Sequence, residues 1–275
     1  MARQKLGQHF LSDAGWRERI ARAIGISSHS LARPVSSEPY SWIEVGAGHG
    51  EMTQHLAATG LPVYAIELDG QLVPKLHQLA GKFPNLSVIQ SDILQTDLAS
   101  IDAGRSLRIY GNLPYYITSP ILQHFFTSIA RIQEIHIVIQ LEVAFRLVAH
   151  PGTRDYAYLS VLTQYFSRPA IALKLPPGAF RPPPKVGSAL VSLKLPGLRS
   201  QLGLANDQAF LDFVKICFAQ KRKTLLNNLR AIASPDDIHG ALSSLNLKHS
   251  ARAEELSVEQ LARLYAELSA SDHVR

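Results

Sequence analysis

Glu44-Val45-Gly46-Ala47-Gly48-His49-Gly50 is the stretch of sequence that decides the fold. It follows an apolar, β-branched run and precedes a helical pattern, so the glycines stand at a strand-to-helix turn. Glycine lets the backbone bend sharply and approach a ligand without a Cβ in the way. Dinucleotide and adenosylmethionine sites share such a turn. Here the third glycine comes two residues after the second, not three as in the dinucleotide fingerprint, which disfavours a nicotinamide enzyme.

The segments around this turn alternate between strand-like and helical patterns. Short apolar runs separated by helical periodicity predict an α/β fold, in which helices cover both faces of a parallel sheet. The expected strands are 41–45, 63–67, 86–90, 108–111, 135–140, 170–175 and 189–195. The expected helices among them are 52–58, 71–82, 121–130, 142–149 and 158–166.

Past Gly197 the pattern changes to helices only, and this change predicts a second domain. We expect an α/β catalytic domain over residues 1–200 and a small all-α domain over residues 201–275. A chain of 275 residues is long enough for both. The expected helices of the second domain are 207–218, 224–232, 236–245 and 258–269.

The positive charge of the chain is concentrated in one stretch. The formal net charge is +6, which favours a polyanionic partner. Residues 140–200 carry eight Lys/Arg against two Asp/Glu, whereas residues 201–275 carry nine of each and are neutral. We interpret residues 140–200 as the face that meets phosphates. The alternative interpretation is an ordinary solvated basic surface.

Several classes of protein are disfavoured by what the sequence lacks. Cys217 is the single cysteine, which excludes an intramolecular disulfide and a cysteine-rich metal site. No apolar run reaches 18 residues, and the N-terminus has no signal-peptide pattern. We therefore expect a reduced, cytoplasmic protein with no membrane span and no bound metal.

Two acidic residues extend the ligand site predicted at the glycine turn. Glu67 ends the second strand, about 20 residues past the turn, where nucleotide-binding folds place a carboxylate on ribose hydroxyls. Asp92 follows the third strand, where its carboxylate could accept a hydrogen bond from an adenine amine. Because ligands of an open parallel sheet collect at the carboxyl ends of its strands, these loops should converge. The alternative role for each acid is capping the next helix.

Four sequence blocks between residues 7 and 225 carry a family resemblance. Gly111-Asn112-Leu113-Pro114-Tyr115 looks like the N-P-P-Y-type motif of amino methyltransferases. Gly7-Gln8-His9-Phe10-Leu11 resembles a G-Q-N-F-L motif, with His9 in place of Asn. Residues 176–186 and 218–225 are similar to P-P-x-A-F-x-P-x-P-K-V and F-x-Q-R-R-K-T-L. By these blocks the chain is identified as a member of the ribosomal RNA adenine N6-dimethyltransferase family, most similar to its bacterial small-subunit branch.

This resemblance implies a fold, a reaction and partners. The fold is a Rossmann-like class I methyltransferase domain with a mostly parallel seven-stranded sheet. The co-substrate is S-adenosylmethionine, and no metal is involved. The implied substrate is small-subunit (16S) ribosomal RNA in a pre-30S particle. There the enzyme dimethylates N6 of two adjacent adenosines in a hairpin near the 3′ end, as a monomer. The implied cofactor-binding residues are His9, Leu11, Gly46, Gly48, Glu67, Asp92 and Asn112.

The chemistry explains why the motif after the fourth strand needs its residue types. The N6 lone pair of adenine is delocalised into the ring, so the amine is a poor nucleophile. Acceptors aimed at the N6 hydrogens favour pyramidal geometry and stabilise the positive charge that develops on nitrogen. We expect the Asn112 side-chain amide and the Leu113 carbonyl to be these acceptors, with Pro114 stiffening the turn. No strong base is needed, because the methylated ammonium gives its proton to water.

The target base must also leave its stack to reach the cofactor, and aromatic rings can hold it. Tyr115 and Phe180 are the expected clamp. For Tyr115 the alternative role is ordinary packing, and for Phe180 it is a hydrophobic plug under the proline-dense loop.

Three other functions compete with the one implied by the resemblance. A large-subunit RNA methyltransferase that confers antibiotic resistance would use the same chemistry, but the proline motif and the helical tail favour the small-subunit enzyme. A DNA adenine methyltransferase would normally need a larger target-recognition region. A non-catalytic RNA-binding assembly factor is disfavoured by the intact motif at Asn112–Tyr115 and the intact glycine turn.

Overall fold

The computed structural model describes residues 9–26 and 39–272. Within it the chain divides into two compact units. The first unit contains Met1–Ala144 and Ala170–Leu195, and the second contains Phe145–Pro169 and Pro196–Arg275. This division differs from the expected boundary near residue 200, because residues 145–169 group with the C-terminal helices. In the described residues, no helix is both long and apolar enough to cross a membrane.

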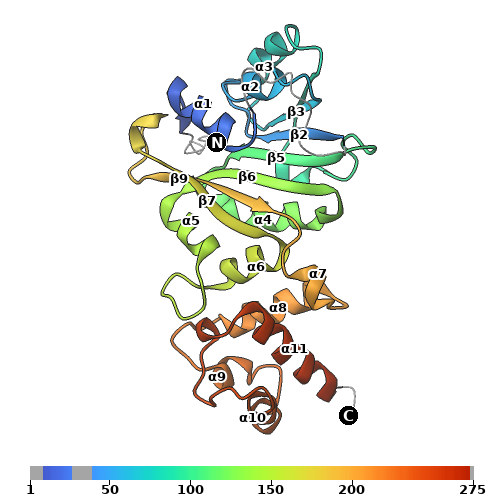
Figure 1. The fold of residues 1–275 in the computed structure, drawn as a ribbon, viewed down its shortest axis with the longest axis vertical. Helices are drawn as coiled ribbons and strands as arrows, with labels where there is room; N and C mark the ends of the chain where they lie inside the picture. Colours follow the sequence, from blue (N-terminus) through green and yellow to red (C-terminus); the bar gives the residue numbers. More distant parts are fainter. Residues whose placement is uncertain (1–8, 27–38, 273–275) are drawn as a thin grey trace, which may run out of the picture. The chain divides into compact units, whose positions relative to one another are not determined.

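The first unit is built on a seven-stranded sheet, which confirms the predicted fold class (Figure 1). The strand order is β4-β3-β2-β5-β6-β9-β7. The four pairings from β4 through β6 are parallel, and β6 pairs with β9 in the antiparallel sense. The strands are β2 (Tyr40–Val45), β3 (Val63–Glu67), β4 (Leu86–Gln90), β5 (Ser106–Asn112), β6 (Ile132–Gln140), β7 (Arg168–Leu175) and β9 (Ser188–Lys194).

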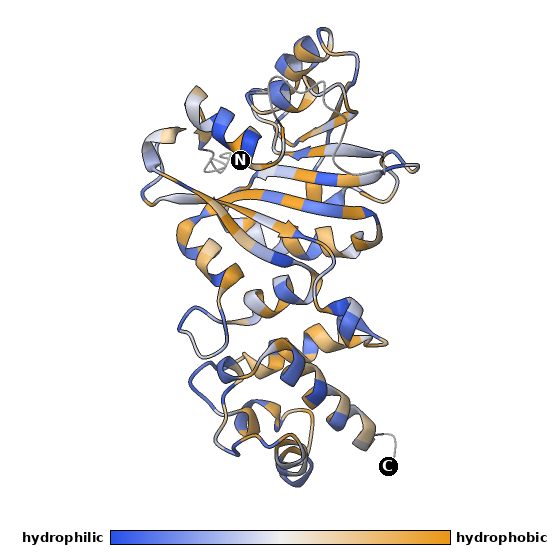
Figure 2. Cartoon of the chain, in the orientation of Figure 1, coloured by the Kyte–Doolittle hydropathy of each residue, from blue (hydrophilic) through white to orange (hydrophobic). Residues whose placement is uncertain are grey.

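The central strands β2, β5 and β6 are mostly buried, whereas the edge strand β7 alternates between exposed and half-buried positions. All six residues of β2 are buried, as expected for a central strand covered on both faces. Figure 2 shows hydrophobic residues along the central strands of this unit. The helices are α1 (Ala14–Ala23), α2 (Thr53–Ala57), α3 (Val73–Ala80) and α4 (Thr118–Thr127), and α5 (Leu141–Val148) begins as the chain leaves the unit. Short 3-10 turns are η1 (Ile93–Gln95), η2 (Tyr115–Ile117), η3 (Ile129–Arg131) and η4 (Pro177–Ala179).

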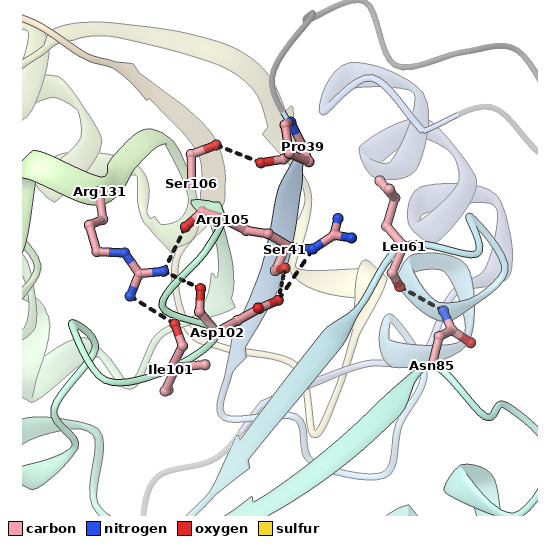
Figure 3. A network of polar contacts seen from close by, with 9 residues as sticks. All are labelled: Pro39, Ser41, Leu61, Asn85, Ile101, Asp102, Arg105, Ser106 and Arg131. Atoms are coloured by element: carbon pink, nitrogen blue, oxygen red, sulfur yellow. Dashed lines mark hydrogen bonds and ion pairs between the residues drawn. The ribbon is translucent and has the colours of Figure 1, made fainter.

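A polar network fixes the amino edge of the sheet (Figure 3). Arg131 donates hydrogen bonds to the carbonyls of Ile101 (2.8 Å), Asp102 and Arg105 (2.6 Å). The Asp102 carboxylate accepts from Ser41 Oγ at 2.5 Å, near the start of β2. A guanidinium that satisfies several carbonyls holds the loop before β5 in one conformation. The polar groups at the amino edge of the sheet are therefore used in hydrogen bonds within the protein. A ligand site is better sought at the carboxyl edge.

A second, two-stranded sheet was not expected from the sequence. Strand β1 (Phe10–Leu11) pairs antiparallel with β8 (Phe180–Arg181) from the proline-dense loop. The backbone N–H groups of Ser12 and Asp13 both donate to the Ala179 carbonyl, at 3.1 and 3.3 Å. The N-terminal strand is thus fastened to a loop about 170 residues away in sequence.

The second unit is helical around its own core. Tyr165, Phe210 and Cys217 are fully buried within it. The Tyr165 hydroxyl donates to Asp207 at 2.6 Å, and Arg199 pairs with the same carboxylate at 2.6 Å. Its helices are α6 (Tyr158–Phe166), α7 (Arg199–Leu202), α8 (Asp207–Cys217), α9 (Leu225–Leu229), α10 (Pro235–Ser244), η5 (Ala253–Glu255) and α11 (Val258–Asp272).

Candidate active site

A pocket opens at the carboxyl ends of β2, β3, β4 and β5, where the sequence predicted that the loops converge. The strand order reverses at β2, because β3 and β5 lie on its two sides. Open α/β sheets bind their ligands at such a switch point. The pocket is lined by His9, Phe10, Val45, Gly46, Gly48, Ile66, Glu67, Leu68, Ser91, Asp92, Ile93, Asn112, Leu113, Pro114, Tyr116, Ile117 and Ile121.

The glycine turn leaves room for a ligand at the floor of this pocket. Gly46 and Gly48 have φ values of +69° and +59°, which side chains of L-residues rarely adopt. A Cβ on Gly48 would lie 3.2 Å from the Phe10 ring, and one on Gly46 would lie 3.8 Å from the Asn112 carbonyl oxygen. Side chains at these positions would fill the cradle, so the turn fits a ligand that approaches the backbone closely.

Glu67 joins the end of β3 to the glycine turn. Its Oε2 accepts from the Gly48 N–H at 2.8 Å, and its Oε1 accepts from the Asp69 N–H at 2.8 Å. The side chain is 3% exposed, so these two bonds fix the carboxylate in one orientation. Each carboxylate oxygen can accept a further hydrogen bond, which a ligand hydroxyl can donate.

Asp92 caps a short helix and also lines the pocket. Its Oδ1 accepts from the Leu94 N–H at 2.9 Å, which caps the short helix η1. The residue also lines the pocket, next to Ser91 and Ile93. Capping uses one lone pair of a carboxylate that has four acceptor positions, so the cap leaves capacity for a ligand amine.

Asn112 is held by the backbone of the N-terminal strand. Its Nδ2 donates to the His9 carbonyl at 2.8 Å. This bond assigns the amide orientation, because a carbonyl can only accept, and so Oδ1 remains the acceptor of the side chain. The next residue is anchored too, since the Leu113 N–H donates to the Val138 carbonyl at 3.1 Å. The motif therefore presents a pre-oriented acceptor at the pocket wall.

The N-terminal strand closes one side of the pocket. His9 donates from Nδ1 to the Pro182 carbonyl at 2.7 Å, which ties the strand to the proline-dense loop. The Phe10 ring packs edge-to-face on His49, with centroids 4.4 Å apart. The strand thus touches the glycine turn, Asn112 and the loop at once.

Three of the predicted site residues are not placed at the pocket by the structure. Leu11 and Phe180 are 4% and 1% exposed and belong to the hydrophobic core of the first unit. The β1–β8 pairing sets them opposite each other and buries both, so Phe180 here fills the plug role. The side chain of Tyr115 lies outside the described part of the chain, as do Gly7 and Gln8.

Some lining residues were missed by the sequence reasoning. Leu68 and Ser91 are direct neighbours of Glu67 and Asp92, and Tyr116 follows directly on Tyr115. Their adjacency to predicted residues on strand-end loops was the available signal. Leu68 and Tyr116 are also exposed, by 53% and 65%. Large apolar side chains that stay exposed at a pocket indicate a binding surface.

A buried acid lies beneath the glycine turn. Glu44 is 2% exposed at the end of β2, and burial raises the pKa of its carboxyl to about 8. The neighbouring Thr53 hydroxyl opposes this shift of the pKa, while the nearby charges of Glu51 and Glu67 add to it. Near neutral pH the Glu44 carboxyl is therefore largely protonated, and Glu67 is the acid that bonds directly to the turn.

In the described residues, no group of three or more His, Cys, Asp and Glu side chains is arranged to hold a metal ion. The lining instead combines two carboxylates, one oriented amide and apolar walls. Such a set suits an organic ligand with hydroxyl and amine donors.

Comparison with known proteins gives a consistent family match. The family model described as "Ribosomal RNA adenine dimethylase" matches residues 1–270. "Ribosomal RNA small subunit methyltransferase A" of Acidobacterium capsulatum is 41% identical over 266 residues, which cover 96% of this chain and 90% of that protein. The protein of the same name from Koribacter versatilis is 37% identical over 277 residues, covering 96% and 93%.

Two solved structures share the fold. A dimethyladenosine transferase from Plasmodium falciparum superposes with a TM-score of 0.78 at 23% identity, covering 96% of this chain and 98% of that one. The 23S rRNA methyltransferase ErmE gives a TM-score of 0.69 at 24% identity, covering 94% and 99%. At these identities the likeness supports the fold alone.

The buried position of Glu44 predicts a pH-dependent stability. Its pKa is raised from 4.5 to about 8, so between these values the folded chain holds a proton that the unfolded chain has lost. Stability should therefore fall as pH rises through this window, by up to about 1.4 kcal/mol per pH unit. Glu44→Gln should remove this dependence. Urea unfolding at pH 5 to 8.5 tests it, with Glu142→Gln, at an exposed acid, as control; equal slopes for Glu44→Gln and the parent would contradict it.

Proposed function

Because this chain belongs to the ribosomal RNA adenine dimethylase family, we propose that it transfers methyl groups from S-adenosylmethionine to adenine N6 in small-subunit ribosomal RNA. The family makes it an enzyme, an S-adenosylmethionine-dependent methyltransferase. The observation that carries the proposal is the hydrogen bond from Asn112 to the His9 carbonyl, which leaves an oriented acceptor in the pocket.

The pocket residues fit the co-substrate. Glu67 would accept from the ribose hydroxyls and Asp92 from the adenine amine, because both carboxylates keep acceptor capacity at the lining. Gly46 and Gly48 give the backbone clearance that a nucleoside needs. His9, Leu11 and Asn112 complete the proposed set: His9 and Asn112 line the pocket, and Leu11 is the buried second residue of the N-terminal strand β1.

The chain's own residues act on the target amine. S-adenosylmethionine, when bound, supplies a methyl group that is electrophilic because it is attached to a sulfonium. Asn112 Oδ1 and the Leu113 carbonyl accept from the N6 hydrogens and favour the pyramidal amine. Since Nδ2 of Asn112 is already held by the His9 carbonyl, Oδ1 needs little reorganisation to do so. The proton of the methylated nitrogen leaves to water.

The proposed RNA target is more specific than the target that family membership alone implies. We propose two adjacent adenosines in a hairpin near the 3′ end of 16S RNA, within a pre-30S particle, and a monomeric cytoplasmic enzyme. The names of the Acidobacterium and Koribacter relatives support the small subunit. All eight basic residues of 140–200 are exposed, which supports phosphate contact: Arg146, Arg154, Arg168, Lys174, Arg181, Lys185, Lys194 and Arg199.

The cofactor assignment predicts that Glu67→Ala and Asp92→Ala each weaken S-adenosylmethionine binding by about one to two orders of magnitude, because a buried ligand donor loses its acceptor. Isothermal calorimetry on the folded variants measures this. Asp69→Ala is the matched control, since that carboxylate caps Gln71 on the same loop but does not line the pocket. Parent-like affinity in both variants would exclude these roles.

The proposed substrate predicts that only one ribosomal RNA becomes methylated. With labelled S-adenosylmethionine and separated ribosomal subunits, the methyl groups should appear on two neighbouring adenosines of the small-subunit RNA. Mapping the modified nucleotides by mass spectrometry locates them. Label on the large-subunit RNA would instead support the antibiotic-resistance function, and no label on either would support an assembly role.

The chemical role of Asn112 predicts a loss of rate without a loss of RNA affinity. The hydrogen bond from the N6 amine to Asn112 Oδ1 should become stronger as N6 becomes pyramidal. Asn112 therefore stabilises the transition state more than the ground state. Asn112→Ala should lower the single-turnover methylation rate by about two to three orders of magnitude at saturating S-adenosylmethionine. RNA binding, measured by filter retention, should stay within about twofold. Near-parent rates in this variant would show that the amine is not activated in this way.

A further inference from the structure

The second unit has a pocket of its own, which shares no lining residue with the candidate active site. Three chain segments form it: the end of α5, the junction of α6 and β7, and the stretch after β9. We call it the second-unit pocket, and its lining comes from residues 148–150, 164–169 and 196–201. Its volume is about 430 Å³, within the range of roughly 300–1,000 Å³ that is typical of small-molecule sites.

Hydrogen bonds between these segments hold the walls of the second-unit pocket. Gln164 Nε2 donates to the Ala149 carbonyl at 2.7 Å, which joins the first segment to the second. The Gly197 N–H donates to the Phe166 carbonyl at 2.9 Å, which joins the third segment to the second. A Cβ on Gly197 would lie 2.3 Å from the Ser167 backbone nitrogen, so only glycine lets these two segments approach so closely. The pocket is therefore formed by the backbone fold of the second unit.

The polar side chains at this pocket keep donors that the protein does not use. In the described part of the chain, the side chains of His150, Arg168 and Gln201 make no hydrogen bond or ion pair. By contrast, Arg199 lies outside the lining and is paired with Asp207 at 2.6 Å. No described lining residue is an Asp or a Glu. An unpaired guanidinium and an imidazole, without an acid in the same lining, favour an anionic ligand.

The other walls of the second-unit pocket fit a larger group than an oxyanion alone. Val148, Pro169, Pro196 and Leu198 supply apolar surface on which a ring can rest. The amide of Gln201 can both donate and accept, as the edge of a nucleobase does. A nucleotide combines these features, because it carries a phosphate, an apolar ring face and a hydrogen-bonding edge.

We propose that the second-unit pocket binds one nucleotide, with the Arg168 guanidinium on its phosphate and the apolar walls against its nucleoside. Arginine suits this role because its planar fork can donate two parallel hydrogen bonds to phosphate oxygens. A free mononucleotide and a single nucleotide of an RNA strand present the same chemistry to the pocket. The inference goes beyond the proposed methyl transfer and does not rest on it, since the two pockets have no lining residue in common.

Calorimetric titration of the 275-residue chain with guanosine monophosphate tests the proposal. S-adenosylmethionine is kept saturating, so that the nucleotide does not enter the candidate active site. Arg168→Ala should weaken binding of the monophosphate by about tenfold to a hundredfold, because charge-assisted hydrogen bonds to the phosphate are lost. In the parent, guanosine should bind more weakly than the monophosphate by a similar factor. Guanosine affinity should stay within about twofold in Arg168→Ala, because guanosine has no phosphate for Arg168 to contact.

Arg230→Ala is the matched control, because Arg230 is an exposed arginine of the second unit that does not line the pocket. It should bind the monophosphate like the parent. The proposal is overturned if the parent does not bind the monophosphate at millimolar concentration, or if guanosine binds as tightly as the monophosphate. It is also overturned if Arg168→Ala binds the monophosphate like the parent, or if Arg230→Ala loses as much affinity as Arg168→Ala.

Filter retention of small-subunit RNA, with and without the monophosphate, then identifies the source of the nucleotide. If the pocket takes a nucleotide of an RNA strand, saturating monophosphate should lower the RNA affinity of the parent to that of Arg168→Ala. The RNA affinity of Arg168→Ala should then not respond to the monophosphate. If the pocket takes a free nucleotide, the monophosphate should leave the RNA affinity of both proteins unchanged.

Discussion

The parallel pairing of β2 with strands on both of its sides is the constraint on which the site depends. Because β3 and β5 flank β2, the chain leaves the sheet in opposite directions on the two sides, and a crevice opens at their carboxyl ends. The glycine turn and Asp92 follow β2 and β4, and Glu67 and Asn112 are the last residues of β3 and β5. The sheet thus brings together four chain segments that are distant in sequence, and the hydrogen bond from Gly48 to Glu67 joins two of them. At the opposite edge, the Arg131 network fixes the connection that returns to β5.

The sheet was predictable from sequence, because buried parallel strands have runs of apolar residues. Most of the pocket was predictable too, because the carboxyl ends of parallel strands lie at one edge of the sheet. The two-residue strands β1 and β8 carry no such signature. The two strands are about 170 residues apart in sequence. Two extended residues have the same sequence pattern whether they lie in a loop or pair with another strand. This is why Phe180 was expected at the ligand and is found in the core. The proline-dense motif that contains Phe180 could be found in the sequence. Whether the Phe180 ring is buried, however, depends on the pairing of β8 with β1.

The same pairing explains how the family's Asn can be replaced by His9. The bond that orients Asn112 comes from the backbone carbonyl of residue 9, which every amino acid possesses. The side chain of His9 is used elsewhere, as a donor to the Pro182 carbonyl. An amide and an imidazole differ in shape, but both can donate one hydrogen bond to a carbonyl. The hydrogen bond that orients Asn112 therefore does not require a particular side chain at residue 9.

The candidate active-site pocket and the basic surface residues differ in charge, and under the proposed function this difference would separate recognition of the RNA backbone from recognition of the base. The pocket carries two carboxylates, Glu67 and Asp92, and no Lys or Arg is among its described lining residues. A phosphate brought into this space would be repelled, whereas a neutral base would not. The exposed basic residues of 140–200 lie outside the pocket and occur in both units. Under the proposed function, RNA phosphates would be attracted to this surface, while the uncharged base would enter the pocket. Under the proposed function, the same two carboxylates would favour the positive charge carried by a sulfonium and developed on the amine.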